Sequence, residues 1–144
     1  MSVSEGLRRA NHFLDLLADF RRYFSNPYRL ANDNVRNKAE KLLAQAKKAS
    51  SYSFAIKIQA KELSELIIKT NRLIPVTIIS DNKTFVLARR VGKVGIISQK
   101  SIQLKPGSYT FEGVRNGFKS KLVQAFIPYD RSDFSVQVIC DEPI

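Results

Sequence analysis

The hydrophobic pattern of the chain changes its period near residue 73, and this change constrains the fold more than any other feature. Before it, apolar residues recur every three or four positions, as in amphipathic helices. Beyond it they alternate, as in half-buried strands. No flexible linker separates the two patterns. They predict an α+β fold in which three N-terminal helices, residues 1–72, pack on a C-terminal antiparallel β-sandwich of about six strands, residues 73–144.

Three helical segments are expected in the first half. The first ends at Asn26-Pro27, because a proline disfavours the helical conformation of the residue before it. The second runs from Tyr28 to a break at Ser50-Ser51, and the third runs from Ser53 to Asn71. The expected apolar stripes are Leu7, Ala10, Phe13, Leu14, Leu17, Phe20 and Phe24 in the first; Leu30, Val35, Ala39, Leu42, Leu43, Ala46 and Ala49 in the second; and Ile56, Ala60, Leu63 and Ile67 in the third, broadened by Ile58, Leu66 and Ile68.

The alternating half is divided by turn residues. Segments 74–80 and 84–91 are expected to form a hairpin around the turn at 81–83, and a second turn is expected at 92–95. Further strands are expected at 96–104, 108–114, 119–129 and 134–140. Several short strands at this spacing are typical of an antiparallel sandwich or open barrel.

Five residues of the second half are expected to act through the backbone. Pro106 and Gly107 suit a type II turn, and Asn116-Gly117 is the pair found in tight hairpins. Gly113 shares a strand face with Tyr109 and Phe111, which we expect in the core. Its missing side chain indicates a bulge or a close neighbouring backbone.

This turn pattern resembles the PEGA domain, a small β-sandwich of the bacterial cell envelope. The matching residues lie within about 75–141 and are Leu104, Pro106-Gly107, Tyr109, Gly113, Gly117-Phe118 and Val136-Gln137-Val138, with Arg115-Asn116 before the last glycine. Many relatives carry a more acidic or aromatic run at the position of Lys119–Lys121. The resemblance implies a β-sandwich that attaches or scaffolds at the envelope.

Positive charge dominates the composition. The 144 residues include 24 Lys and Arg against 13 Asp and Glu, for a net charge of +11. This excess fits a polyanionic partner and fits a solubilising surface equally well. The candidate polyanion-binding residues are Arg89, Arg90, Lys93, Lys105, Arg115, Lys119 and Lys121. The second helix adds Arg36, Lys38, Lys41, Lys47 and Lys48, which we interpret as a solvated face.

The sequence offers little for catalysis. A single cysteine, Cys140, and a single histidine, His12, cannot build a structural zinc site. We interpret Cys140 as a small apolar strand residue, with a reactive thiol as the alternative, and His12 as a partly exposed helix residue. The glycines of Arg90–Gly95 lack the following helix that a phosphate-binding loop needs. We therefore predict a protein that is not an enzyme and that holds no cofactor or metal.

The sequence supports two alternative hypotheses for the function. The first is a non-enzymatic binding or scaffolding module of the cell envelope, whose sandwich binds a protein or cell-wall component. The alternative is a basic protein that binds nucleic acid through its phosphates. Self-association through a longer helical assembly is a further option. No apolar run approaches the ~20 residues of a membrane span, and we expect no signal peptide. The location is then the periplasm or envelope if the chain is part of a longer protein, and the cytoplasm otherwise.

Overall fold

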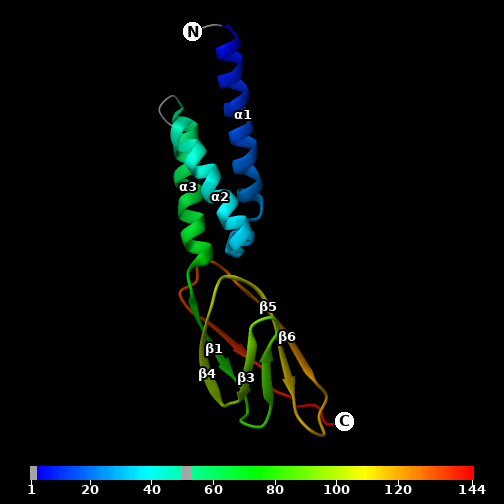
Figure 1. Ribbon diagram of the computed structural model, residues 1–144. Helices are drawn as coiled ribbons and strands as arrows, with labels where there is room; N and C mark the ends of the chain where they lie inside the picture. The colour runs from blue at the N-terminus through cyan, green and yellow to red at the C-terminus, as the bar shows by residue number, and fades with distance from the viewer. Residues whose placement is uncertain (1–2, 50–52) are drawn as a thin grey trace. The chain divides into compact units, whose positions relative to one another are not determined.

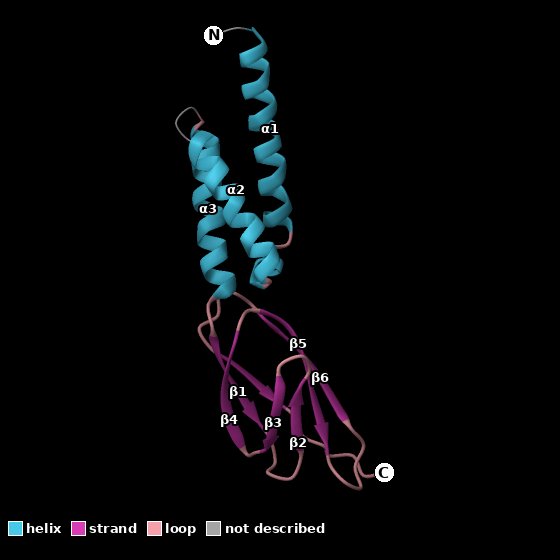
Figure 2. Ribbon diagram, in the orientation of Figure 1, coloured by secondary structure: helices cyan, strands magenta, loops and turns pink. Residues whose placement is uncertain are grey.

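The computed structural model describes residues 3–49 and 53–144, and in the first helix it describes side chains from His12 onward. The described residues form three α-helices followed by seven strands, which confirms the predicted α+β class (Figure 1, Figure 2). The chain divides into two compact units, Met1–Asn71 and Arg72–Ile144. Each unit has its own hydrophobic core.

The helical unit contains α1 (Val3–Ser25), a short 3₁₀ helix η1 (Pro27–Ala31), α2 (Asp33–Ala49) and α3 (Phe54–Asn71). As predicted, α1 ends before Pro27. The second α-helix starts later than expected, because Pro27 to Ala31 form a 3₁₀ turn and Asn32 then caps α2. The Asn32 Oδ1 accepts the backbone N–H groups of Asn34 and Val35, at 2.9 and 3.2 Å. The predicted break at Ser50-Ser51 lies outside the described residues.

The core of the helical unit comes from all its helices. Its buried residues are Leu16, Phe20, Leu30, Ala39, Leu42, Ala46, Ala49, Ile56, Leu63 and Ile67. The alanines of α2 leave room for close helix packing. From residue 12 onward, the predicted stripes are largely confirmed.

Three predicted stripe residues are exposed instead. Leu14 is 60% exposed, and Ile58 and Ile68 are 42% and 69% exposed. Leu14 lies six positions before Phe20, which places it about 120° around the helix from the buried face. Ile58 and Ile68 each lie five positions from Leu63, about 140° around α3. The apolar stripes predicted for α1 and α3 are therefore wider than the buried faces of these helices. The prediction also omitted Leu16, which is buried.

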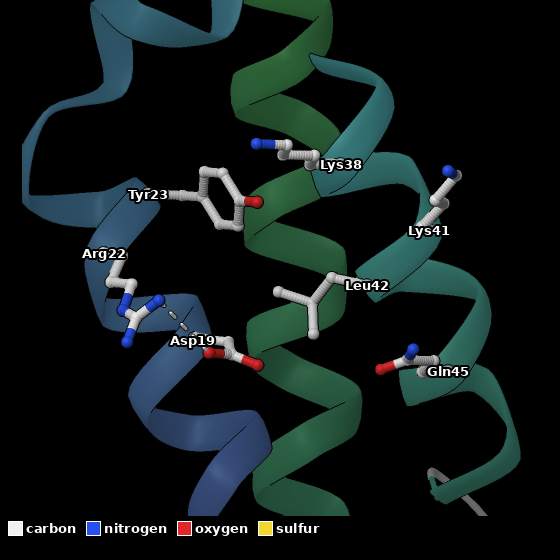
Figure 3. A pocket seen from close by; sticks show the side chains of 7 residues that line it. All are labelled: Asp19, Arg22, Tyr23, Lys38, Lys41, Leu42 and Gln45. Carbon is white, nitrogen blue, oxygen red and sulfur yellow. Dashed lines mark ion pairs between the residues drawn. The ribbon is translucent and has the colours of Figure 1, made fainter. Parts of the chain in front are cut away.

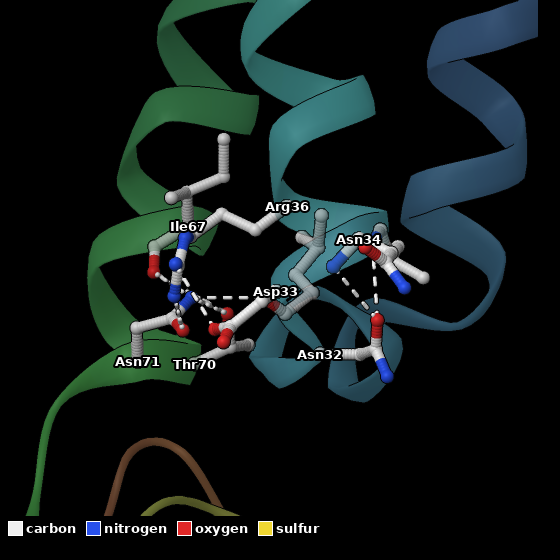
Figure 4. A network of polar contacts seen from close by, with 9 residues as sticks. Asn32, Asp33, Asn34, Arg36, Ile67, Thr70 and Asn71 are labelled. Carbon is white, nitrogen blue, oxygen red and sulfur yellow. Dashed lines mark hydrogen bonds and ion pairs between the residues drawn. The ribbon is translucent and has the colours of Figure 1, made fainter.

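A polar network joins η1, α2 and α3 (Figure 4). The Asn71 side-chain amide donates to the carbonyl oxygens of Leu30 and Ile67, each at 2.9 Å. The Asn71 Oδ1 accepts a bond of 2.9 Å from Arg36, whose guanidinium also pairs with Asp33 at 3.0 Å. One asparagine thus links the last turn of α3 to both neighbouring elements.

All residues of the second unit are described, and they form two sheets. The strands are β1 (Ile74–Ile79), β2 (Phe85–Ala88), β3 (Gly92–Ile96), β4 (Gln99–Leu104), β5 (Gly107–Val114), β6 (Lys121–Ile127) and β7 (Phe134–Gln137). The three-stranded sheet has the order β4-β1-β7, and the four-stranded sheet has the order β3-β2-β5-β6. All neighbours are antiparallel except β1 and β7, which are parallel.

The predicted hairpin of 74–80 with 84–91 is wrong. β1 pairs with β4 and β7, whereas β2 pairs with β3 and β5. The cause is the turn at Asp81, whose Oδ1 accepts the backbone N–H groups of Lys83 and Thr84, at 3.0 and 2.8 Å. This Asx turn leads the chain from one sheet into the other.

The predicted turn at 92–95 is also wrong, because these residues belong to β3. The reversal occurs earlier, where the Val91 N–H donates to the Ala88 carbonyl oxygen at 3.1 Å. Arg90 has a left-handed φ of 65° in this turn. Gly95 has a φ of 106° and lies opposite Val86, where the register of the β2–β3 pair shifts.

The other predicted turns lie between strands. Pro106 precedes β5, and Gly107, with a φ of 141°, begins it. Asn116 and Gly117 lie in the loop joining β5 to β6, where the Phe118 N–H donates to the Arg115 carbonyl oxygen at 3.1 Å. This loop spans residues 115–120, so the hairpin is looser than predicted.

The interior of the sandwich is apolar. Its buried residues are Ile74, Val76, Ile78, Val86, Ala88, Val94, Leu104, Phe111, Ile127, Val136 and Val138. Phe111 is fully buried and Tyr109 packs against this core, as predicted. A Cβ at Gly113 would meet the side chains of Thr84, Val138 and Cys140, so side chains rather than backbone fill the space beside it.

Candidate functional site

The four-stranded sheet carries apolar side chains on the side away from the core. Val86 and Ala88 of β2 are buried, so the alternate residues Phe85 and Leu87 point outward. Directly paired residues share a face of a sheet. The register then gives the apolar residues of this surface, here named the outer face: Phe85, Leu87, Ile96, Val114, Leu122 and Phe126.

The pairing orders the outer face in rows across the sheet. One row places Phe85 between Ile96 and Val114. In the next row, Lys93, Leu87, Glu112 and Leu122 follow one another from β3 to β6. Phe126 pairs with Ser108 further along. Phe85, Ile96 and Val114 are therefore direct neighbours across strands. Glu112 separates Leu87 from Leu122, and Gln124 lies between Leu122 and Phe126 on β6.

Much of this apolar surface is in contact with solvent. Ile96 is 58% exposed, Leu122 54%, Phe126 48% and Val114 45%. Single exposed apolar residues are common in proteins, so it is their number on one sheet that makes the outer face the candidate site.

The outward side of the three-stranded sheet can be compared with the outer face, because both belong to the same unit. Its side away from the core carries mainly polar residues, namely Thr77 on β1, Gln99, Ser101 and Gln103 on β4, and Ser135 and Gln137 on β7, together with Pro75 and Ile79. One sandwich thus has a mainly polar outer surface and a second one on which six apolar residues lie among polar ones such as Glu112 and Gln124. A solubility requirement alone explains the first and not the second.

One end of the outer face is hollowed. An open cavity of about 520 Å³ is lined by residues 89–91 and 108–110. A second, of about 340 Å³, is lined by residues 108–110 and 124–126. The small side chains of Ser108 and Thr110 leave these depressions between Arg89 and Phe126.

Few charges border the outer face. Arg89 lies on it and pairs with Glu112 at 3.6 Å between Nε and Oε2. Lys93 is exposed beside Leu87, and Arg90 is exposed in the adjoining turn. Since Arg89 offsets Glu112, the border is positive.

The predicted polyanion-binding residues do not form one patch. Arg89, Arg90 and Lys105 lie toward the start of β5. Arg115 and Lys119 lie beyond its other end, and Lys121 pairs with Gly113 near that end. β5 has eight residues and so spans roughly 25 Å. Arg115 pairs with Asp81 at 3.8 Å and Lys119 pairs with Glu142 at 3.9 Å, while Lys93 lies on the edge strand β3.

The other candidate groups are separate from the outer face. His12 is exposed on α1, and Cys140 is 1% exposed with its backbone N–H donating to the Thr84 Oγ1 at 3.1 Å. Among the described residues, no group of three or more His, Cys, Asp or Glu is placed to hold a metal ion. No described helix combines the length and apolar character of a membrane span.

Sequence reasoning missed the outer face. The signal was present in Phe85–Ala88, where four successive apolar residues interrupt the alternation and so place apolar groups on both sides of the strand. Leu122 to Ile127 shows the same pattern, broken only by Gln124.

No protein-family model matches this chain, and no curated protein was found to be similar to it. The resemblance to the PEGA domain stays a prediction.

Proposed function

We propose that the sandwich is a non-enzymatic binding or scaffolding module that docks a partner protein on its outer face. The observation that supports this function is the contrast between the two outer surfaces of the sandwich. Both belong to the same small unit, and the apolar one carries Ile96, Leu122 and Phe126 about half exposed. An aromatic and aliphatic cluster of this kind supplies the central contacts of protein interfaces.

The partner is an acidic protein with an apolar contact surface. Lys93 and Arg90 border the outer face, and Arg89 offsets Glu112. The whole chain carries a net charge of +11, so a second copy would be repelled while an acidic partner would be attracted. Charge complementarity therefore favours a different protein over self-association on this surface.

The cell envelope is our proposed location. Its support is the PEGA-like turn pattern around Pro106-Gly107 and Gly117-Phe118. Fractionation of cells that produce the native protein tests the location independently of binding. Recovery in the cytosolic fraction alone would separate the binding role from the envelope.

Site-directed photo-crosslinking tests the docking surface. A photo-reactive residue at Leu122 is expected to form an adduct with an acidic protein, which is then purified for binding measurements. The matched control places the same group at Gln103, which is exposed on the polar surface, on an edge strand as Leu122 is. Adducts of equal yield from both positions, or an adduct with a second copy of the chain, would contradict the proposal.

Affinity measurements with the purified partner make the test quantitative. Leu122→Ser removes an exposed apolar contact of the outer face and is expected to weaken binding about tenfold. Gln103→Ser should leave the affinity unchanged. Equal affinities for both variants would assign the contact to another surface.

The alternative function is nucleic-acid binding, which the net charge of +11 supports. Binding through phosphates to duplex DNA should weaken by about 0.9 log unit per contact for each log unit of salt. A gel-shift series at increasing salt measures this slope. Absence of any shift at low salt rejects the alternative.

A further inference from the structure

A groove in the helical unit is lined by cations from three successive elements. One cavity of about 160 Å³ has Arg22 and Tyr23 of α1, Arg29 of η1 and Lys38 of α2 in its wall, together with Asn26. Of the described residues that line this cavity, none is acidic. Every polar side chain there can donate a hydrogen bond.

A second cavity of about 210 Å³ adjoins the first and shares Arg22, Tyr23 and Lys38 with it. Figure 3 shows this cavity, with Lys38 directed across it toward Tyr23 and Leu42 pointing between the helices. Leu42 is 5% exposed, so it forms an apolar floor. The groove therefore has an apolar floor and a charged rim.

Asp19 is the acidic residue among those lining the second cavity. It lies 4.0 Å from Arg22, between Oδ1 and Nη1, and the Arg22 side chain is 81% exposed. An exposed pair at this distance is weak. Arg22 thus keeps most of its capacity to bind an anion.

The Tyr23 phenol reports the electrostatics of the groove. Burial raises its pKa, and the Asp19 carboxylate raises it further, while Arg22 and Arg29 both act to lower it. Both guanidiniums are therefore close enough to the phenol to influence its charge. This agrees with the lining of the first cavity, to which Arg22, Tyr23 and Arg29 all contribute.

Helix stability alone does not explain the cluster. A cation in the last turn of a helix offsets the helix dipole, and this accounts for Arg22 in α1. Arg29 lies in a 3₁₀ turn and Lys38 lies within α2, so neither serves α1 in this way.

We propose that this groove binds a phosphate group. Guanidinium groups donate paired hydrogen bonds that match phosphate oxygens, and Lys38, Tyr23 and Asn26 supply further donors. The ligand is a compact dianionic phosphate, carried either by a soluble phosphate compound or by the exposed monoester of a lipid headgroup. The site lies in the helical unit, so it is independent of docking on the outer face.

Titration with pyrophosphate tests the site in the full-length chain. Saturable shifts of the NMR signals of Tyr23 and Lys38 are expected at millimolar concentrations. Arg29→Gln combined with Lys38→Gln should weaken binding about tenfold, because two charged donors are lost. Spectrophotometric titration gives a second readout, since bound pyrophosphate is an anion that should raise the pKa of Tyr23, and Tyr23→Phe should abolish that change.

The matched control is Lys69→Gln combined with Lys100→Gln, which changes the net charge equally at exposed residues that do not line the groove. Circular dichroism checks that each variant is folded. Vesicles containing phosphatidic acid distinguish the sources: sedimentation that depends on Arg29 and Lys38 indicates a lipid phosphate, and pyrophosphate binding alone indicates a soluble one. The proposal is overturned if neither probe binds, or if the control variant loses as much affinity.

Discussion

At position 113 of β5 there is room for a hydrogen atom and little more. An added Cβ would lie 2.9 Å from the Thr84 Cγ2, 3.1 Å from the Val138 Cγ1 and 3.3 Å from the Cys140 Sγ. These atoms come from two segments that are distant in sequence from Gly113, one at Thr84 and one at Val138 to Cys140. Gly113 is therefore required by packing and not by an unusual backbone angle.

Gly113→Ala is expected to destabilise the sandwich by about 1–3 kcal/mol, the usual range for overpacking a core. Urea unfolding measures the loss. Thr84→Ser removes the closest methyl group but keeps the hydroxyl that accepts the Cys140 N–H. The double variant should recover part of the loss, and strictly additive effects would contradict this explanation.

Asp81 links the stability of the sandwich to pH. Burial raises the pKa of its carboxyl group, but the N–H bonds from Lys83 and Thr84 outweigh burial and hold the pKa below its ordinary value of 3.8. A lowered folded-state pKa means that the stabilisation is fully present above the unfolded pKa. It is lost as the pH falls through the lower, folded-state value.

Asp81→Asn keeps the acceptor oxygen of the turn and removes the charge. It should destabilise the protein at neutral pH by about 1 kcal/mol, since hydrogen bonds to a charged acceptor are stronger. Urea unfolding of both proteins across a pH series is the measurement. The difference should shrink on acidification below the ordinary carboxyl pKa, and a gap that stays constant would rule out this origin.

Among the elements, η1, α2 and the end of α3 depend on Asn71. Its amide satisfies the Leu30 carbonyl oxygen at the end of a 3₁₀ turn, which has few partners of its own. Its Oδ1 also holds Arg36. The residue thus connects elements that are some forty positions apart in the sequence.

Asn71→Ala should cost about 1–3 kcal/mol, because a partly buried carbonyl and a guanidinium each lose a partner. The loss is measured by circular dichroism during urea unfolding. Asn37→Ala on the exposed side of α2 is the control, and it should be neutral or stabilising by a few tenths of a kcal/mol. Equal losses for both variants would mean that helix propensity, and not the network, dominates.

The elements were more predictable than their pairing. The period of the hydrophobic pattern and the helix-breaking proline locate the helices and most strands, because both act on neighbouring residues in the sequence. The partners of β1 were missed, since an Asx turn at Asp81 has the composition of a hairpin turn but changes sheets. The basic residues from Arg89 to Lys121 are close in sequence, yet β5 separates them in space. The outer face was missed because the strand faces were considered only for β5, where Tyr109 and Phe111 were expected in the core.

For the whole molecule, two separate cores predict that each unit folds alone. A fragment of residues 72–144 should give a dispersed amide NMR spectrum, and one of residues 1–71 should be helical by circular dichroism. Starting at residue 72 keeps the Arg72 bonds to the carbonyl oxygens of Tyr129 and Arg131, at 3.1 and 2.9 Å. A fragment of residues 73–144, which lacks these bonds, should be less stable than the fragment of residues 72–144. An amide NMR spectrum of residues 72–144 without dispersion would show that the units depend on each other.

The parallel neighbour of β1 has a consequence for biosynthesis. β1 is the first strand of the sandwich to leave the ribosome, and β7 is the last. Until β7 emerges, the backbone of β1 has an open side that any extended chain could occupy. The three-stranded sheet can therefore form completely only after Phe134–Gln137 have been synthesised. A nascent chain stalled before Phe134 would expose an unpaired strand edge that chaperones recognise.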